Sequence, residues 1–263
     1  NNTSFREKGG VFIRNEGERK NSIYIYKESR MPQSSLNKIG EVVEGIELAE
    51  IAKKGDKILI QTEPSPVFVI GMTQRDAEEY LKNLNILQER IGNTDDNSIV
   101  VAQYPPNSLE IHSSGKVKTE GVDPDDLLYI EFFEEEAPET VEYVRNTTEL
   151  YKNYPIGKFE VLVSTDSLIL FKGKGKKEVI REHENLPEGR VEPGILGMTN
   201  MSRPQYGILG VRFTPSDEFG PTGEPFESTN IFGRVVRGLD KLKDKKKVVW
   251  FKDVTKRSGP AEI

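Results

Sequence analysis

Apolar residues along most of the chain gather in short runs that favour β-strands. Such runs are rich in Val, Ile, Tyr and Phe and are bounded by Gly, Pro, Asn and Asp. In the first part of the chain they are VFI (11–13), SIYIY (22–26), KIGEVV (38–43) and KILIQT (57–62). After the middle they are LLYIEFF (127–133), FEVLV (159–163), SLILF (167–171), YGILGVRF (206–213), IFGRVV (231–236) and KVVWFKDV (247–254). This density of short strands predicts a β-barrel or β-sandwich.

Two segments follow a helical period instead. In TQRDAEEYLKNLN (73–85), Thr73 and Asp76 form an N-cap signature, and apolar residues from Ala77 to Leu84 share one face. In APETVEYVRNTTELY (137–151), Pro138 suits a first turn, and Val141, Val144 and Leu150 are expected to point inward. PVFVIG (66–71), just before the first of these segments, and SIVVAQYPPNSLEI (98–111), after it, read as further strands. Residues 64–118 are therefore predicted to be a small α+β insert.

One pattern occurs twice. NKIGEVVEGIELA (37–49) and NIFGRVVRGLDKL (230–242) share Asn, Gly, Val-Val and a second Gly at matching positions. The two glycines permit close backbone approach or positive φ where a strand turns into a short helix. The sequence therefore predicts the same strand-to-helix element in two places.

Composition excludes several classes of chemistry. The chain of 263 residues has a net charge of −6, with no basic field to attract nucleic acid or an anionic membrane. It has no cysteine, and its two histidines, His112 and His183, lie far apart, so neither a thiol nucleophile nor a His-rich metal site is expected. No run of about eighteen apolar residues exists, so a soluble, cytoplasmic protein is expected.

Four segments, taken in order, resemble the signature segments of the cyclophilins. They are YIEFFEEEAPETVEYVRNTTEL (129–150), EPGILGMTN (192–200), STNIFGRVVRGLDKL (228–242) and KVVWFKDV (247–254). The resemblance implies an eight-stranded closed barrel with a helix at an end. The predicted fold is mainly β with a few helices: a cyclophilin-like closed β-barrel, part of a second such barrel, and a small α+β insert.

The repeat then sets the predicted domain organisation. Residues 1–63 are expected to be the C-terminal half of a first cyclophilin-like domain, 64–118 the insert and 119–263 a complete second domain. Because half a barrel leaves sheet edges unpaired, we expect preceding sequence or another chain to complete the first domain.

The positions that carry cyclophilin activity differ in this chain. Aligned on Phe159 and Gly173, the family's Arg falls at Val161 and its Gln near Phe171, and neither side chain can donate a hydrogen bond. The resemblance places Asn200 at the family's Ala-Asn pair and Thr229 where many members have His. No catalytic residue is predicted; a peptidyl-prolyl isomerase using Arg212 or Asn200 is the alternative.

Three charged clusters have side chains of the kind that bind ions. The lysines of FKGKGKKE (171–178) suit a phosphate, Glu134 to Glu136 a hard cation, and REHEN (181–185) another cation. A solvated hairpin, an acidic first helical turn and a surface turn explain them better. No cofactor or metal site is predicted.

The loop EFGPTGEPFESTN (218–230) is the predicted partner-binding element. Phe219 and Phe226 either anchor a partner or pin the loop to its own barrel, and we expect at least one ring to be partly exposed. The predicted partner-binding residues are Phe219, Phe226, Asn200, Thr229 and Arg212.

Over most of its length the chain resembles the methanogenesis marker protein 3 family of methane-metabolising archaea. That resemblance implies a non-catalytic role in assembling or activating methyl-coenzyme M reductase, with protein partners rather than membrane or nucleic acid.

Overall fold

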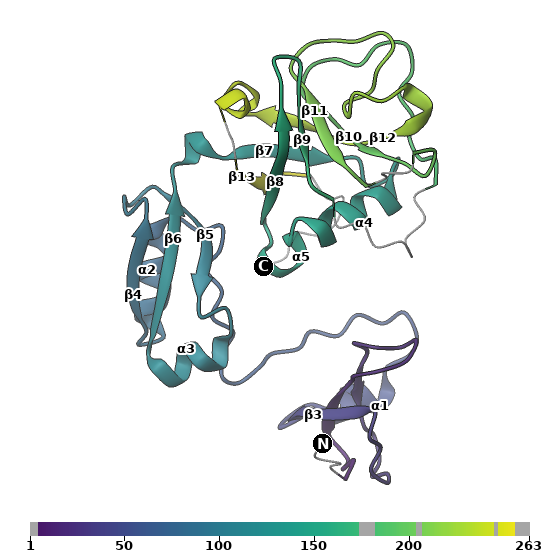
Figure 1. Ribbon diagram of the computed structural model, residues 1–263. Helices are drawn as coiled ribbons and strands as arrows, with labels where there is room; N and C mark the ends of the chain where they lie inside the picture. The colour runs from purple at the N-terminus through teal and green to yellow at the C-terminus, as the bar shows by residue number, and fades with distance from the viewer. Residues whose placement is uncertain (1–4, 174–181, 204–206, 245–246, 256–263) are drawn as a thin grey trace. The chain divides into compact units, whose positions relative to one another are not determined.

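The computed structural model describes residues 5–173, 182–203, 207–244 and 247–255. The chain divides into two compact units, Asn1–Gln61 and Thr62–Ile263. Strands predominate, and one closed barrel is present (Figure 1). The predicted fold class, mainly β with a cyclophilin-like closed barrel, is confirmed.

The first unit is built on a three-stranded sheet of order β2-β1-β3. Its elements are β1 (Gly10–Arg14), β2 (Ile23–Ile25), β3 (Leu36–Glu41) and the short helix α1 (Ile46–Ile51). Among the described residues of this unit, the buried apolar side chains are Phe12 and Leu36. The Phe12 ring packs edge-on against Tyr26, with centroids 5.4 Å apart. A core of this size covers little of the sheet.

The strand predicted at 57–62 does not form. Residues 57–62 are in no strand, and Ile58, Leu59 and Ile60 are 48%, 88% and 63% exposed. A strand needs a neighbour to accept and donate its backbone hydrogen bonds. In the described part of the first unit this segment has no such neighbour.

The barrel in the second unit closes through strands in the order β10-β11-β9-β8-β13-β7-β12. The strands are β7 (Leu128–Phe132), β8 (Ile156–Ser164), β9 (Leu168–Phe171), β10 (Ile195–Thr199), β11 (Leu209–Arg212), β12 (Thr229–Arg237) and β13 (Val248–Asp253). The pair of β13 with β7 is parallel and the others are antiparallel. The described residues thus give a barrel of seven strands, one fewer than the sequence predicted.

Alternation along the strands fills the barrel. In β7 every second residue, from Leu128 to Phe132, is buried. Inside, the Phe159 ring stacks between Phe171 and Phe251, with centroid distances of 4.6 and 4.5 Å. Aromatic stacking of this kind contributes beyond the area that each ring buries.

The helix predicted at 137–151 is two helices, α4 (Pro138–Thr147) and α5 (Leu150–Asn153). They separate at Glu149, whose φ of 61° cannot continue a right-handed helix. Val141, Val144 and Leu150 are buried as expected. Short 3₁₀ turns complete the unit: η1 (Pro124–Asp126), η2 (Phe226–Ser228) and η3 (Leu239–Asp244).

The insert packs helices against a sheet of order β4-β6-β5. Its elements are α2 (Gln74–Asn83), β4 (Leu87–Gly92), β5 (Ile99–Tyr104), α3 (Ser108–Ser114) and β6 (Lys116–Val122). The Thr73 hydroxyl accepts from the Asp76 N–H at 3.0 Å, so the predicted N-cap is confirmed.

Two strand predictions in the insert are wrong. SLEI belongs to α3, because the Asn107 side chain caps a helix there by accepting from the Leu109 N–H. PVFVIG forms no ladder: the Val69 N–H donates to the Gln103 side chain instead of to a neighbouring strand.

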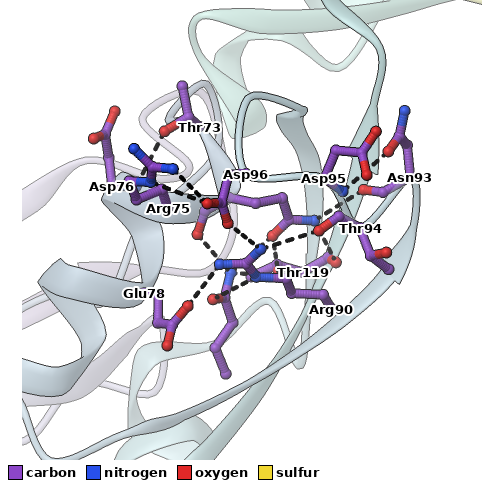
Figure 2. A network of polar contacts seen from close by, with 12 residues as sticks. Thr73, Arg75, Asp76, Glu78, Arg90, Asn93, Thr94, Asp95, Asp96 and Thr119 are labelled. Atoms are coloured by element: carbon purple, nitrogen blue, oxygen red, sulfur yellow. Dashed lines mark hydrogen bonds and ion pairs between the residues drawn. The ribbon is translucent and has the colours of Figure 1, made fainter.

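A polar network fixes one end of the insert (Figure 2). The Arg90 guanidinium contacts Glu78 at 2.6 Å and Asp96 at 2.8 Å, and Arg75 contacts Asp96 at 2.5 Å. Hydrogen bonding to Arg75, and next to Arg90, holds the pKa of Asp96 below its ordinary value. Lys82, and next Arg90, lower the pKa of Glu78 in the same way. This network ties α2 to β4 and to the loop after it.

An apolar cluster joins the insert to the barrel within the second unit. It contains Ile70 and Val101 of the insert, Leu127 and Ile156 at the barrel, and Trp250 on β13. None of the helices in the described ranges is long and apolar enough to cross a membrane.

Candidate binding face of the barrel

The two positions matched to cyclophilin's Arg and Gln pair across β8 and β9. Phe171 is fully buried and stacks on Phe159 inside the barrel, and Val161 packs against the same core. Both side chains are therefore part of the packing inside the barrel. Neither can stabilise a twisted imide by donating a hydrogen bond.

The outer face of the neighbouring strands is also apolar. Because successive side chains of a strand point to opposite faces, Leu170 lies on the face opposite Phe171. Leu170 pairs with Gly210 on β11, and Gly210 pairs with Gly197 on β10. The outward position next to Phe171 is therefore a leucine, and it lies beside two glycines.

The loop 218–230 lies on this glycine pair. A Cβ on Gly197 would come within 2.9 Å of the Pro221 ring, and one on Gly210 within 2.7 Å of the Pro221 carbonyl oxygen. Real Cβ atoms do not approach that closely, so the loop reaches the sheet because both positions are glycine. Pro221 and Thr222 are buried there. The loop's own residues thus fill the outer face of β10 and β11.

Hydrogen bonds hold the loop in a tight hairpin. The Gly220 N–H donates to the Glu224 carbonyl at 2.7 Å, and Phe219 bridges to Pro225. The Thr222 and Thr229 hydroxyls, both buried, are 2.8 Å apart. Such a loop is ordered before any partner arrives.

Asn200 and Thr229, two of the predicted partner-binding residues, are fully buried. The Asn200 amide donates to the Glu227 carbonyl at 2.9 Å and to the Asn230 Oδ1 at 3.1 Å. With Thr229 bonded to Thr222, both residues lie beneath the loop and support it from inside.

Asn230 is the centre of this buried network, which the sequence did not single out. Its Nδ2 donates to the Thr140 hydroxyl at 3.1 Å and to the Glu182 carbonyl at 2.8 Å, and its Oδ1 accepts from the Glu184 N–H at 3.1 Å. The signal was present, because Asn opens both copies of the repeat.

The remaining predicted residues lie nearer the surface. Phe219 is 42% exposed and Phe226 is half-buried, which confirms that at least one ring of the loop is accessible. Arg212 pairs with Leu168 on β9, and its Nε donates to the Thr214 carbonyl at 3.1 Å. Burial lowers the pKa of Arg212. Partner binding by these residues stays a prediction.

The charged clusters have structural partners. Glu134 forms an ion pair with Arg145. The Glu184 carboxylate accepts from the N–H groups of Glu139 and Thr140 and so caps α4, where the helix dipole favours an anion. His183 bonds to Ser202 at 2.7 Å. Lys174, Lys176 and Lys177 lie outside the described residues. Among the residues that are described, no group of three or more His, Asp and Glu side chains is placed to hold a metal.

The barrel residues match the model of a known protein family. Residues 128–254 match a family model described as "Putative peptidyl-prolyl cis-trans isomerase domain". These residues run from the first strand of the barrel to the end of its last.

Relatives match a longer stretch of the chain. A UPF0288 protein of Methanothermobacter thermautotrophicus is 41% identical over 239 residues, which are 90% of this chain and 45% of that protein. One from Methanopyrus kandleri is 38% identical over 245 residues (92% and 47%), and one from Methanosarcina acetivorans 37% over 240 (89% and 45%). The chain spans about half the length of these curated relatives. It is thus similar to UPF0288 proteins of methanogenic archaea over nearly all of its own length.

Proposed function

We propose that this chain is a non-catalytic, cyclophilin-like binding protein that helps to assemble or activate another protein. The observation that carries the proposal is the loop 218–230, which packs over the outer face of β10 and β11, together with the lack of donors at the two positions matched to those of the isomerases. Gly197 and Gly210 lie under Pro221, and the paired positions 161 and 171 are apolar. A proline-containing peptide would have to displace the buried Pro221–Thr222 segment to reach that face.

The proposed partner is methyl-coenzyme M reductase or its activation machinery. Two lines support this choice: the resemblance of the chain to the methanogenesis marker protein 3 family, and the methanogenic archaea in which its relatives occur. A role in that assembly also accounts for a barrel that keeps its fold without the isomerase side chains.

Phe219 is the proposed anchor. An aromatic residue that enters a pocket on a partner commonly contributes more than about 2 kcal/mol on truncation to alanine. The hairpin around Phe219 is already held by the Gly220–Glu224 hydrogen bond and by the ion pair of Arg203 with Glu224 at 2.5 Å. Pre-ordering lowers the entropy lost on docking, so more of the contact energy is available for binding.

The test is capture of purified methyl-coenzyme M reductase by the immobilised chain. Phe219→Ala is expected to weaken capture at least about tenfold while the melting temperature changes little, because the ring is partly exposed. Tyr154→Ala removes a ring that is 44% exposed elsewhere on the barrel and should leave capture unchanged. Equal capture by all three proteins, or none by the parent chain, contradicts the proposal.

The alternative is a peptidyl-prolyl isomerase, which the description of the matching family model favours. In that case the donor is expected to be Arg212, the cation on the outer face of β11. Isomerisation of a short prolyl peptide that is lost in Arg212→Ala would support this alternative and overturn the non-catalytic one. A rate no faster than the uncatalysed reaction supports the binding protein.

A further inference from the structure

The three strands of the first unit repeat three strands of the barrel. The order β2-β1-β3 corresponds to β11-β10-β12, with the middle strand antiparallel to both neighbours in each case. The register also corresponds: Val11 pairs with Gly40 as Leu196 pairs with Gly233, and an irregularity follows at once in both ladders. The sequence repeat is therefore part of a larger structural one.

The hydrogen bonds at the start of the middle strand agree as well. Gly9 has a φ of 82° and Gly194 a φ of 87°. The Gly9 carbonyl accepts from the Val42 N–H at 2.8 Å, and the Gly194 carbonyl accepts from the Val235 N–H at 2.8 Å. This correspondence fixes which residue matches which between the two sheets.

Matched residues differ sharply in burial. In the barrel, five residues of these strands point inward and are fully buried: Leu196, Met198, Leu209, Val211 and Phe232. Their counterparts in the first unit are all branched aliphatic residues, Val11, Ile13, Ile23, Ile25 and Ile39. None of the five is buried, and Ile23 and Ile39 are 61% and 54% exposed. The first sheet thus presents the inner face of a barrel to solvent.

Within the described residues, neither a close contact nor a positive φ requires glycine at position 40. At Gly233, a Cβ would come within 2.5 Å of the Glu131 carbonyl oxygen of β7, the neighbouring strand. At Gly40 nothing lies within 4 Å of the Cβ position, and its φ is not positive. The glycine suits a strand that would run along the outer edge of β3 as β7 runs along β12.

Asn37 matches Asn230, but the described residues of the first unit do not provide the hydrogen-bond partners that Asn230 has. Asn230 is bonded to Thr140 on α4 and to residues 182 and 184, all of which precede β10 in the chain. The matched Asn37 is exposed, and its Oδ1 accepts a 3.4 Å hydrogen bond from the Asn15 amide. The described residues of the first unit contain no counterpart of the segment that holds Asn230.

The failed strand at 57–62 fits the same account. It follows the first copy of the repeat as β13 follows the second. β13 takes its two neighbours from β7 and β8. Among the described residues the first unit has no counterparts of those two strands, and Ile58, Leu59 and Ile60 stay exposed.

We propose that the first unit is an acceptor for a β-α-β-β block built like Leu128–Phe171, and that the two together close a second barrel. The first strand of the block pairs with the outer edge of β3, as β7 pairs with β12. Its last strand pairs with the outer edge of β2, as β9 pairs with β11. The segment 57–62 becomes a strand between the first and second strands of the block, as β13 lies between β7 and β8.

The proposed occupant is a further segment of a longer polypeptide, one of the length that the relatives have. The matched region is 45% of the M. thermautotrophicus protein, so that protein has more than enough further chain for a block of this size. Exposed strand edges beside an apolar face otherwise invite aggregation.

The test compares backbone amide hydrogen exchange in this chain and in the full-length M. thermautotrophicus relative. Amides at positions matching 23–25, 39–44 and 57–62 are expected to exchange at least about 100-fold more slowly in the full-length protein. Opening free energies range from near zero at an open edge to the full unfolding free energy in a closed core. Amides matching β10, β11 and β12 provide the internal control and should be slow in both proteins.

Each other outcome overturns the proposal. Fast exchange at the three segments in both proteins means that the sheet stays open. Slow exchange in both means that the edges are covered without the added chain. The mass of this chain in solution then shows whether a second copy covers them.

Discussion

The two copies of the repeat show how little of a residue's environment its local sequence decides. In the first unit and in the barrel, the same Asn, Gly and Val-Val pattern gives a strand paired to a middle strand with the same register and the same irregularity. Yet Phe232 is fully buried while Ile39 is 54% exposed. Burial of one such side chain contributes about 1.5–3 kcal/mol. The barrel gains this free energy at each inward position, whereas the first unit as described gains only part of it.

The largest effect expected from this comparison is at the inward aromatic position. Phe232→Ala should lower the free energy of barrel unfolding by about 3–5 kcal/mol, because it leaves a cavity in a closed core. Ile39→Ala should change the stability of this chain by less than about 0.5 kcal/mol, as expected for an exposed site. Urea unfolding followed by Trp250 fluorescence measures the barrel, since Trp250 on β13 is the single tryptophan, and far-UV circular dichroism of the same samples also records the first unit. Equal losses for both variants would contradict the comparison.

The matched glycines, Gly40 and Gly233, should give the next largest difference in stability. Gly233→Val places a Cβ at 2.5 Å from the Glu131 carbonyl and is expected to destabilise the barrel by about 2–3 kcal/mol. Gly40→Val meets nothing within 4 Å and should leave thermal unfolding of this chain unchanged. Calorimetry of both variants measures the difference. A large loss at Gly40 would mean that a strand already lies beside β3.

The matched asparagines give a smaller contrast. Asn230→Ala removes a buried side chain with several hydrogen-bond partners and should cost about 1–3 kcal/mol, because groups such as the Asn200 amide lose a partner. Asn37→Ala should cost almost nothing, since Asn37 is exposed. Denaturant midpoints at equal slope test this pair. Loss of partner capture without loss of stability in Asn230→Ala would be unexpected.

The smallest expected effect is in the insert, whose ion pairs should make its stability depend on pH. The pKa values of Asp96 and Glu78 are lowered by their cationic partners, so these carboxylates stabilise the folded insert above their ordinary pKa. That contribution is lost as the pH falls through the lowered values. The protection of the α2 amides, relative to their intrinsic exchange rates at the same pH, should therefore fall in acid below about pH 4, and Asp96→Asn should reduce this pH dependence. No such dependence in the parent chain would show that the ion pairs contribute nothing measurable.

Sequence patterns predicted the local elements of this protein well. Apolar runs located β1, β2, β3 and the barrel strands other than β10, which only the resemblance to the cyclophilins indicated, and Thr73 marked the start of α2. The failures have different causes. SLEI and KILIQT were both predicted as strands, but Asn107 caps a helix in the first case, and the described residues offer no neighbouring strand in the second. Composition describes what a segment prefers, whereas a strand also needs a partner.

The candidate site was predicted only in part. The sequence indicated the apolar positions 161 and 171 and the accessible ring of Phe219. It did not indicate that Gly197 and Gly210 lie side by side, because the two are in different strands and meet only through their register. Nor did it show that Asn200 and Thr229 lie beneath the loop, since their burial depends on Pro221 and Thr222.

The sequence by itself determined where most strands and turns form, which residues face one side of each strand, and that neither thiol nor cysteine-ligand chemistry is available. These properties depend on neighbours in the chain, through the period of two along a strand and the positive φ that glycine permits. The tertiary structure decided which edges are paired, which apolar faces are covered, and which loop lies on the glycine pair. Those outcomes depend on contacts between residues far apart in the sequence, so two copies of one local pattern end in a closed barrel and in an open sheet.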